Sequence, residues 1–248
     1  MNKEDLVSVI MPTYNAGKYL ADSINSILNQ SYKNLELLIT DDASTDPTTL
    51  QLLQEFASKD NRVDILYLKE NHGAGYARNQ SIERAKGRYI AFCDSDDRWT
   101  TDKLEKQIAF MNKKKCALSC ASYIIFDGET QNEIGFCTAP KKITYGMMKR
   151  DNKVGCLTAI YDVQMLGRKF FMPTIRKRQD WALFLQIIRE CKVCYAYPDK
   201  PLAYYCMRRN SISSNKMSLM KYNIAVYKEI LGFHPIKANL YFFTLFLP

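Results

Sequence analysis

Long apolar runs are absent from the sequence. No stretch of about 18 apolar residues occurs, so we expect no transmembrane helix. The first residues do not place a basic region ahead of an apolar one, so we expect no signal peptide. The 248 residues are 47% hydrophobic and 25% charged, which indicates a globular protein with one large domain, or a domain with an appendage.

Two phosphate-binding motifs are also missing, and histidine is scarce. No G-x-G-x-x-G follows the first apolar segment and no G-x-x-x-x-G-K-[ST] occurs, which argues against a dinucleotide-binding fold and a P-loop. Neither of the cysteine pairs 116/120 and 191/194 has a histidine nearby, so we do not expect structural zinc. The eight cysteines are scattered through apolar segments, which is typical of buried thiols in a reducing cytosol.

Positive charge, by contrast, is in excess. The formal net charge of +9 favours an anionic partner, such as a nucleotide, a phospholipid surface or nucleic acid. We find no known nucleic-acid-binding module, so we expect no nucleic acid partner. Charge alone does not choose between the other two.

The first hundred residues alternate between strand and helix patterns four times. Apolar, often β-branched segments at 6–11, 35–39, 63–68 and 89–93 are each followed by helical spacing. This alternation is typical of βαβ units and a parallel sheet. The strand ends carry the polar residues Thr13, Asn15, Asp41, Asp42, Asn71, Arg78, Asp94 and Asp96. Because ligands bind outside the carboxyl ends of strands in such sheets, we expect a nucleotide-type pocket there.

The most informative stretch is the acidic run that follows the segment at 89–93. Asp94, Asp96 and Asp97 would repel one another unless a positive charge lay among them. Magnesium or manganese takes one or two protein carboxylates and fills its other positions with water and substrate phosphates. The run therefore suggests metal-assisted chemistry on a phosphorylated substrate. The alternative is a polar turn in which Asp97 caps the next helix.

The second half alternates less regularly. We expect a helix at 99–114, β-structure at 116–126, a hairpin turn at 127–128 with a return strand at 133–137, a mobile loop or short helix at 141–152, and strands at 154–161 and in a pair over 193–205. A basic loop at 173–178 leads into a helix with Asp180 in its first turn. This carboxylate is either functional or a complement to the helix dipole.

The last part of the chain reads as helical. A basic, hydroxyl-rich segment at 208–215 suits phosphate oxygens, and helices follow with lysines and, at 240–247, aromatic side chains. Lysine combined with exposed aromatics suggests a surface that lies on anionic lipid without crossing it. The alternative is that these helices pack back onto the domain.

Five motifs, in this order and spacing, resemble the inverting family 2 glycosyltransferases with a GT-A fold. They are the segments 7–15, 41–46, 73–79, 87–99 and 178–181. The nearest resemblance is to bacterial enzymes that build surface polysaccharides such as teichuronic acid, capsule and O-antigen. The family implies an α/β fold: a Rossmann-like, mostly parallel central sheet flanked by helices, a small antiparallel part on the acceptor side, and a C-terminal helical tail.

The resemblance also implies domain boundaries and residue roles. The glycosyltransferase domain would span 1–215, with a nucleotide-binding half (1–100) and an acceptor half (101–215), and the tail would span 216–248. The nucleotide-sugar would be bound by Pro12, Thr13, Tyr14, Asp41, Asp42, Arg78, Asp94 and Ser95. In this family pattern, Asp42 would accept the N–H of the uracil imide.

The chemical roles fall on the remaining motif residues. Asp96 would bind Mn²⁺ or Mg²⁺, and Asp94 would reach the metal or the ribose. Asp180 would be the general base, although the usual Glu-Asp pair is here Gln179-Asp180. Arg208 and Arg209 fall in a late basic segment that would contact phosphates, although Cys206 replaces a frequent arginine.

The expected reaction is metal-dependent transfer of a hexose from a UDP-sugar, with inversion, to a sugar linked to a polyprenyl diphosphate. We expect a cytoplasmic protein held peripherally at the inner face of the plasma membrane, with homo-oligomers as an option. Glucose, galactose, N-acetylhexosamine and rhamnose donors stay open. The alternatives are a nucleotidyltransferase, which usually carries a glycine-rich basic loop after its first strand, and a non-catalytic nucleotide-sugar-binding protein.

Overall fold

The central sheet is built from parallel strands that alternate with helices, as predicted. The computed structural model describes residues 5–208 and 216–246. In spatial order the eight strands are β3 (Val63–Tyr67), β2 (Leu35–Asp41), β1 (Val7–Thr13), β4 (Tyr89–Phe92), β10 (Ile160–Asp162), β6 (Leu118–Ala121), β11 (Val193–Tyr197) and β9 (Lys142–Thr144). β3, β2, β1 and β4 run parallel, whereas β10 and β9 are antiparallel to their neighbours. The α/β class and mostly parallel sheet are confirmed.

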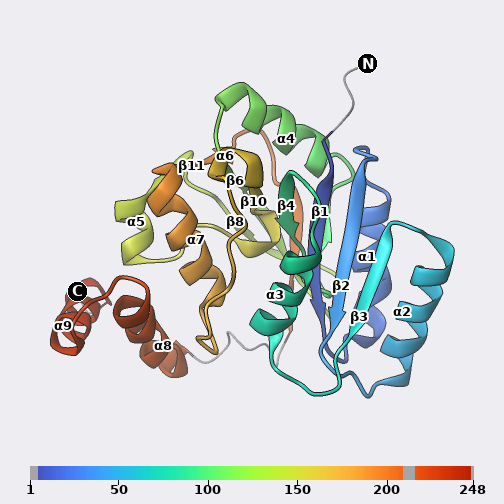
Figure 1. Ribbon diagram of the computed structural model, residues 1–248, viewed down its shortest axis with the longest axis horizontal. Helices are drawn as coiled ribbons and strands as arrows, with labels where there is room; N and C mark the ends of the chain where they lie inside the picture. Colours follow the sequence, from blue (N-terminus) through green and yellow to red (C-terminus); the bar gives the residue numbers. More distant parts are fainter. Residues whose placement is uncertain (1–4, 209–215, 247–248) are drawn as a thin grey trace.

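Helices cover both faces of this sheet, and each face has its own core. The helices flanking it are α1 (Leu20–Leu28), α2 (Pro47–Lys59), α3 (Ala74–Arg84), α4 (Lys103–Lys114) and α7 (Gln179–Cys191). Val9 and Met11 of β1 pack with α1, α2 and α4, whereas Ile10 packs in the cluster of α3 and α7. The split follows from the two-residue period of a strand. Figure 1 shows α3 and α7 in front of the sheet.

A second, four-stranded sheet lies beside the first. Its order is β5 (Arg98–Trp99), β12 (Ala203–Met207), β7 (Tyr123–Asp127) and β8 (Glu133–Cys137). β7 and β8 form the hairpin predicted from Asp127-Gly128. β5 pairs with β12, so the segment that directly follows the acidic run is held by a strand that is distant in the sequence.

Three local predictions for the second half are wrong in detail. The helix expected from Trp99 begins only at Lys103, because Arg98 and Trp99 pair with β12. The expected strand pair at 193–205 is not a pair, since β11 and β12 lie in different sheets. The strand expected at 154–161 consists of a 3-10 turn, Cys156–Thr158, followed by the short β10. In each case the deciding partner is distant in sequence. Shorter helices complete this part: α5 (Tyr145–Arg150), α6 (Val163–Leu166) and a 3-10 turn at Gly17–Tyr19.

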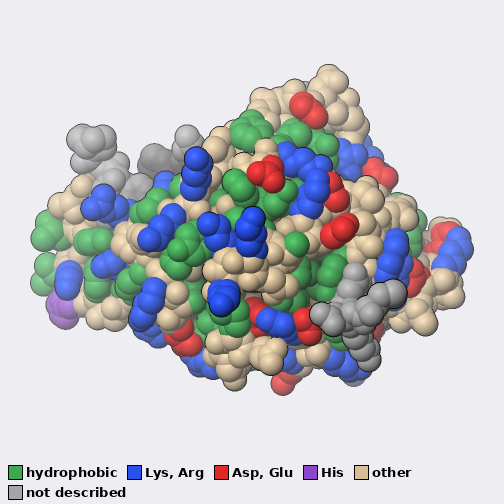
Figure 2. Space-filling view, turned by 90° about the horizontal axis from the view of Figure 1, so that it is seen from above, with side chains coloured by type: hydrophobic (Ala, Val, Ile, Leu, Met, Phe, Trp, Pro, Cys, Tyr) green, Lys and Arg blue, Asp and Glu red, His purple; other side chains and the backbone are tan. Residues whose placement is uncertain are grey.

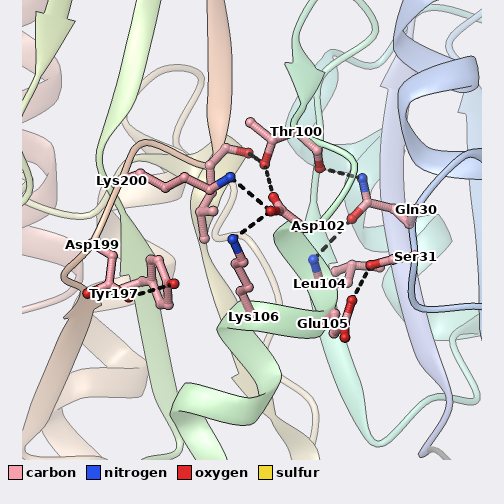
Figure 3. A network of polar contacts seen from close by, with 11 residues as sticks. Gln30, Ser31, Thr100, Asp102, Leu104, Glu105, Lys106, Tyr197, Asp199 and Lys200 are labelled. Carbon is pink, nitrogen blue, oxygen red and sulfur yellow. Dashed lines mark hydrogen bonds and ion pairs between the residues drawn. The ribbon is translucent and has the colours of Figure 1, made fainter.

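A polar network fixes the start of α4, the helix that follows the acidic run in the sequence (Figure 3). Asp102 accepts bonds from Lys106, Lys200 and Thr100, at 2.7, 2.8 and 2.9 Å. Burial works against ionisation of Asp102, but these bonds outweigh it and hold its pKa below the usual range. Gln30 joins the same region by donating to Thr100 and accepting from the Leu104 N–H. The network connects the segment after α1, the start of α4 and the link between β11 and β12.

The C-terminal helices pack back onto the domain. They are α8 (Lys216–Glu229) and α9 (Pro235–Phe246). Val226, Tyr227, Ala238 and Phe242 are buried in the same cluster as α7. Within the described residues, no helix has the length and apolar character needed to cross a membrane. The division of the chain at residue 215 stays a prediction.

Candidate active site

The acidic run forms a tight turn directly after β4. The Asp97 N–H donates to the Asp94 carbonyl at 3.1 Å, which folds the four residues back on themselves. Asp94 and Asp96 both pair with arginine: Arg78 lies 2.5 Å from Asp94, and Arg208 lies 2.5 Å from Asp96. Ser95 lies half-buried between them. The sequence led us to expect a cation among these acids, and the described structure supplies guanidinium groups there.

Asp97 holds the acidic turn in place. It is buried, and its carboxylate accepts the Cys206 N–H at 2.9 Å, which ties the turn to β12. Burial, and then the charges of Asp96 and Asp94, raise the pKa of Asp97 well above its usual value. It does not cap the next helix, because α4 begins at Lys103 after Asp102. That alternative is therefore wrong.

Arg78 connects the acidic turn to Asp180. It projects from α3, is buried, and its Nε has no hydrogen-bond partner among the described residues. Burial disfavours its charge, but the charge of Asp94, the hydrogen bond to Asp94 and other nearby groups together outweigh burial and raise the pKa of Arg78. The charge of Asp180 acts on Arg78 in the same direction. The charges of two carboxylates that are 86 positions apart in the sequence, 94 and 180, thus both act on one guanidinium.

Asp180 stands in the first turn of α7, as predicted. Asn152 donates its amide to Asp180 Oδ2 at 2.8 Å. Burial raises the pKa of Asp180, while its bond with the Trp181 N–H and the charges of Arg78 and Arg178 oppose the rise. A carboxylate with a raised pKa is better suited to taking a proton near neutral pH. Asn152 was missed in the sequence because it is not near Asp180 along the chain.

A glycine lets α3 and α7 approach each other at this site. A Cβ added at Gly75 would lie 2.3 Å from Gln179 Nε2, well inside any normal contact. Gln179 is the first residue of α7, directly before Asp180. Gly75 therefore sets the distance between the helix of Arg78 and the helix of Asp180. The sequence shows a glycine at the start of a predicted helix, but it does not show that Gln179 lies against this glycine.

The end of β1 offers the second half of the site. Thr13 is buried and its Oγ1 has no hydrogen-bond partner among the described residues. Pro12 beside it is buried, whereas Tyr14 is 51% exposed. A buried hydroxyl without a partner is costly in a folded protein unless a ligand or water completes it. Thr13 and Tyr14 are thus available to a ligand at this edge.

Asp41 and Asp42 behave differently from the acids after β4. Both are buried. Asp41 accepts from the Ser44 hydroxyl and N–H, at 2.5 and 3.0 Å. Asp42 accepts the N–H groups of His72 and Gly73, at 2.8 and 2.7 Å. These carboxylates hold the loops after β2 and β3 in place, a role that the sequence analysis did not anticipate.

The acids after β4 have the chemistry that a hard divalent cation needs. Asp94 and Asp96 offer carboxylate oxygens, and burial together with the charge of Asp94 raises the pKa of Asp96. No group of three or more metal-ligating side chains exists within the described part of the chain. The two acids therefore fit a cation that takes its other ligands from a diphosphate and water. The side chain of Arg208, which is 42% exposed, would have to move away from Asp96 for a cation to bind there. Arg209 lies outside the described residues.

Comparison with known proteins adds to this geometry. The sequence model described as Glycosyl transferase family 2 matches residues 8–171. A Bacillus subtilis glycosyltransferase named for teichuronic acid biosynthesis, TuaG, is 42% identical over 238 residues, covering 96% of this chain and 93% of the relative. Escherichia coli WfgD, named a UDP-Glc:alpha-D-GlcNAc-diphosphoundecaprenol beta-1,3-glucosyltransferase, is 38% identical over 216 residues, covering 87% and 83%.

Solved structures agree on the fold. Staphylococcus aureus TarS 1–349 in complex with UDP-GlcNAc superimposes with a TM-score of 0.71 at 20% identity, covering 96% of this chain and 71% of TarS. The Pyrobaculum calidifontis mannosyltransferase PcManGT, in complex with GDP-Man and Mn²⁺, gives a TM-score of 0.69 at 17% identity, covering 97% and 70%. At these identities the likeness concerns the fold alone.

Proposed function

The chain belongs to glycosyl transferase family 2 and is a glycosyltransferase, and on that basis we propose its donor, acceptor and catalytic groups. It transfers a hexose from a UDP-sugar to a hydroxyl of a sugar linked to a polyprenyl diphosphate, in the synthesis of a bacterial surface polysaccharide. The donor class and the lipid-linked acceptor follow the name of the relative WfgD. The surface polysaccharide follows the name of TuaG.

One observation carries the proposal: a single buried arginine lies among the acids of two distant segments. Arg78 pairs with Asp94, and the charge of Asp180 acts on Arg78 as well. A transferase must hold the departing diphosphate close to the base that activates the acceptor. The arrangement around Arg78 supports this, with Asp94 and Asp96 on the donor side and Asp180 on the acceptor side.

The donor nucleotide lies along the ends of β1, β2 and β4. Thr13 and Tyr14 line the base, with Pro12 behind them, and the buried hydroxyl of Thr13 supports this placement. Asp41 and Asp42 shape the neighbouring loops. Each oxygen of Asp42 accepts one backbone N–H from the loop and has a second lone pair, and through one of these Asp42 also accepts the imide N–H of uracil. In this proposal, Ser95 and Asp94 contact the ribose of the donor.

A Mn²⁺ or Mg²⁺ ion would be held by Asp96 and Asp94, and it would neutralise charge that develops on the departing diphosphate. Arg78 and Arg208 contribute positive charge to the same region. Arg209 continues the basic segment. Electrostatic stabilisation of this kind is usually the largest single contribution to the rate.

Asp180 removes the proton from the acceptor hydroxyl as that oxygen attacks the anomeric carbon. The new carbon–oxygen bond forms while the bond to the diphosphate breaks, and the electron pair leaves with UDP. A single displacement inverts the anomeric centre, so an α-linked donor gives a β-linked product. Because positive charge builds on the sugar ring, the carboxylate of Asp180 also stabilises the transition state. The reaction takes place at the inner face of the plasma membrane, where the protein is held peripherally as a monomer or a homo-oligomer.

The Asp180→Asn substitution tests this assignment. We expect transfer from UDP-glucose to a synthetic GlcNAc-diphosphate-lipid, in the presence of Mn²⁺, to fall by about a thousandfold or more, because the amide cannot take a proton. Binding of UDP, measured by calorimetry, should change little. Asp199→Asn is the matched control, since Asp199 is exposed and accepts only a bond from the Tyr197 hydroxyl among the described contacts. If the Asp180→Asn enzyme kept most of its activity, Asp180 would not be the base.

A further inference from the structure

Helix α9 has two apolar faces, and only one of them is covered. Ala238 and Phe242 are buried against the domain. Ile236, Leu240 and Phe243 are 74%, 63% and 45% exposed. Their spacing of four and three residues places them on one side of the helix, away from the buried pair. An exposed apolar stripe of this kind on a helix indicates an interaction surface.

The charge of the two C-terminal helices is predominantly positive. Glu229 is the single acid from residue 216 to the end of the sequence. Lys221, Lys228 and Lys237 are exposed on α8 and α9. Figure 2 shows hydrophobic and basic side chains interspersed at the end of the molecule that these two helices form.

A basic crevice opens directly beside α9. It has a volume of about 380 Å³ and lies between α5 and α9, lined by Thr144, Gly146, Met147, Lys149, Arg150 and Tyr241. Arg150 is exposed and Lys149 half-buried. Asp151, the nearest acid in sequence, is paired with Lys153 at 3.0 Å, so it does not neutralise them. The crevice can accept an anionic group such as a phosphate.

We propose that this part of the molecule docks onto an anionic phospholipid bilayer. The lipid-docking surface consists of the stripe Ile236, Leu240 and Phe243 together with Lys149, Arg150 and Lys237. Apolar side chains insert between the acyl chains, while the cations meet lipid phosphates. A second copy of the chain is disfavoured as the occupant, because it would bring like charges face to face. α9 lies on the surface, since its 12 residues span about 18 Å and the hydrocarbon core is about 30 Å thick.

Packed aromatic side chains connect α9, which carries the lipid-docking stripe, to α7, which carries Asp180. Tyr227 of α8 packs edge-on against Trp181 of α7, with ring centroids 5.7 Å apart, and against Tyr241 of α9 at 5.1 Å. Trp181 directly follows Asp180 in the sequence. If the proposed lipid-linked acceptor is correct, docking through α9 presents the sugar at the bilayer surface to the helix that carries the base. The docking itself does not depend on that function.

Flotation with vesicles tests the docking surface on the full chain. We expect the protein to float with vesicles of phosphatidylcholine mixed with phosphatidylglycerol, and to stay unbound with phosphatidylcholine alone. Leu240→Glu should weaken vesicle binding by about tenfold or more, because it removes inserted apolar surface and adds repulsion. Lys149→Glu combined with Arg150→Glu should weaken it by a similar factor and reduce its salt dependence. Gln54→Glu, on an exposed position of α2, adds the same charge elsewhere and should leave binding unchanged.

Circular dichroism spectra and thermal unfolding should be the same for the Leu240→Glu and Gln54→Glu proteins, since both positions are exposed. The proposal is overturned if the wild-type chain does not float with anionic vesicles, or if Leu240→Glu floats as the wild type does. It is also overturned if analytical ultracentrifugation finds a dimer that Leu240→Glu dissociates while flotation is unaffected. Flotation needs no donor or acceptor, so failure of the proposed glycosyl transfer would appear separately, as an absence of UDP release.

Discussion

Two strand ends of this protein carry paired acids, and the structure uses them in opposite ways. After β2, the carboxylates of Asp41 and Asp42 accept hydrogen bonds from the backbone and hydroxyl groups of nearby loops. After β4, Asp94 and Asp96 pair with arginine side chains. The first pair is buried, whereas the side chains of the second are 36% and 15% exposed. The same sequence pattern therefore produces loop anchors in one place and an open cluster of charge in the other.

The difference lies in what compensates the charge. Backbone N–H groups cannot leave a carboxylate without unfolding the loop, so they fix Asp41 and Asp42 in their positions. A guanidinium on a partly exposed side chain can move, and Arg208 is such a group. Burial and the neighbouring Asp94 keep the pKa of Asp96 raised, so its ionised form is not fully compensated. Acids of this second kind are the ones that can accept a cation or a polar ligand.

Among the acids of the two pairs, the largest effect on activity should come from removing the charge of Asp96. We expect Asp96→Asn to lower transferase activity by about a hundredfold to a thousandfold, because it removes a carboxylate that would hold the cation, and the cation would neutralise the leaving diphosphate. The melting temperature should be unchanged or slightly higher, since the substitution relieves repulsion with Asp94. Activity assays and thermal unfolding on the same preparations check both. A clear fall in melting temperature would place Asp96 with the loop anchors instead.

At Asp42 we expect a substitution to lower the stability of the protein, in contrast to the substitution at Asp96. In the Asp42→Asn protein, one carboxylate oxygen becomes an amide that faces the N–H of His72 or Gly73. Leaving such a buried donor unpaired costs about 1–3 kcal/mol of unfolding free energy. Denaturant unfolding measures this loss, with Asp199→Asn as the control. A variant of unchanged stability would contradict the role of Asp42 as an anchor, whatever its effect on UDP binding.

Only part of this contrast was readable in the sequence. The four strand–helix units, their polar ends and the place of Asp180 in the first turn of α7 follow from local periodicity and turn residues, and the structure confirms them. The roles of the two acidic pairs depend on partners that are distant along the chain. Asp42 is bonded by His72 and Gly73, and Asp96 by Arg208, and no local pattern encodes those contacts.

The same reasoning explains the errors in the second half. β5 is only two residues long and exists because β12 pairs with it. Helical periodicity extended the predicted helix back to Trp99, since nothing local marks that pairing. The amphipathic pattern of the tail allowed both packing and lipid contact. The structure contains the packing through Tyr227 and Phe242, and it leaves a separate stripe exposed on α9.

The smallest effect extends the comparison to a third acid. Asp180 receives a side-chain amide hydrogen bond from Asn152, and its pKa is raised mainly by burial. The base works only when deprotonated, so activity is lost as the pH falls through this pKa. Asn152→Ala removes a bond that favours the ionised carboxylate, and the pKa of Asp180 should rise further. We expect the acid limb of the kcat profile to move to higher pH by about one unit or less, since one unit corresponds to 1.36 kcal/mol.

Activity above this limb should stay near that of the wild type, because the base is then ionised in both proteins. Asn61→Ala, in an exposed turn, is the matched control and should not move the profile. A shift of the limb to lower pH would mean that the Asn152 amide opposes ionisation, and an unmoved limb with a uniformly lower rate would mean that Asn152 only shapes the loop. With the second outcome, the bond between Asn152 and Asp180 would serve position, like the bonds of the loop anchors after β2, and would not tune the charge that takes part in transfer.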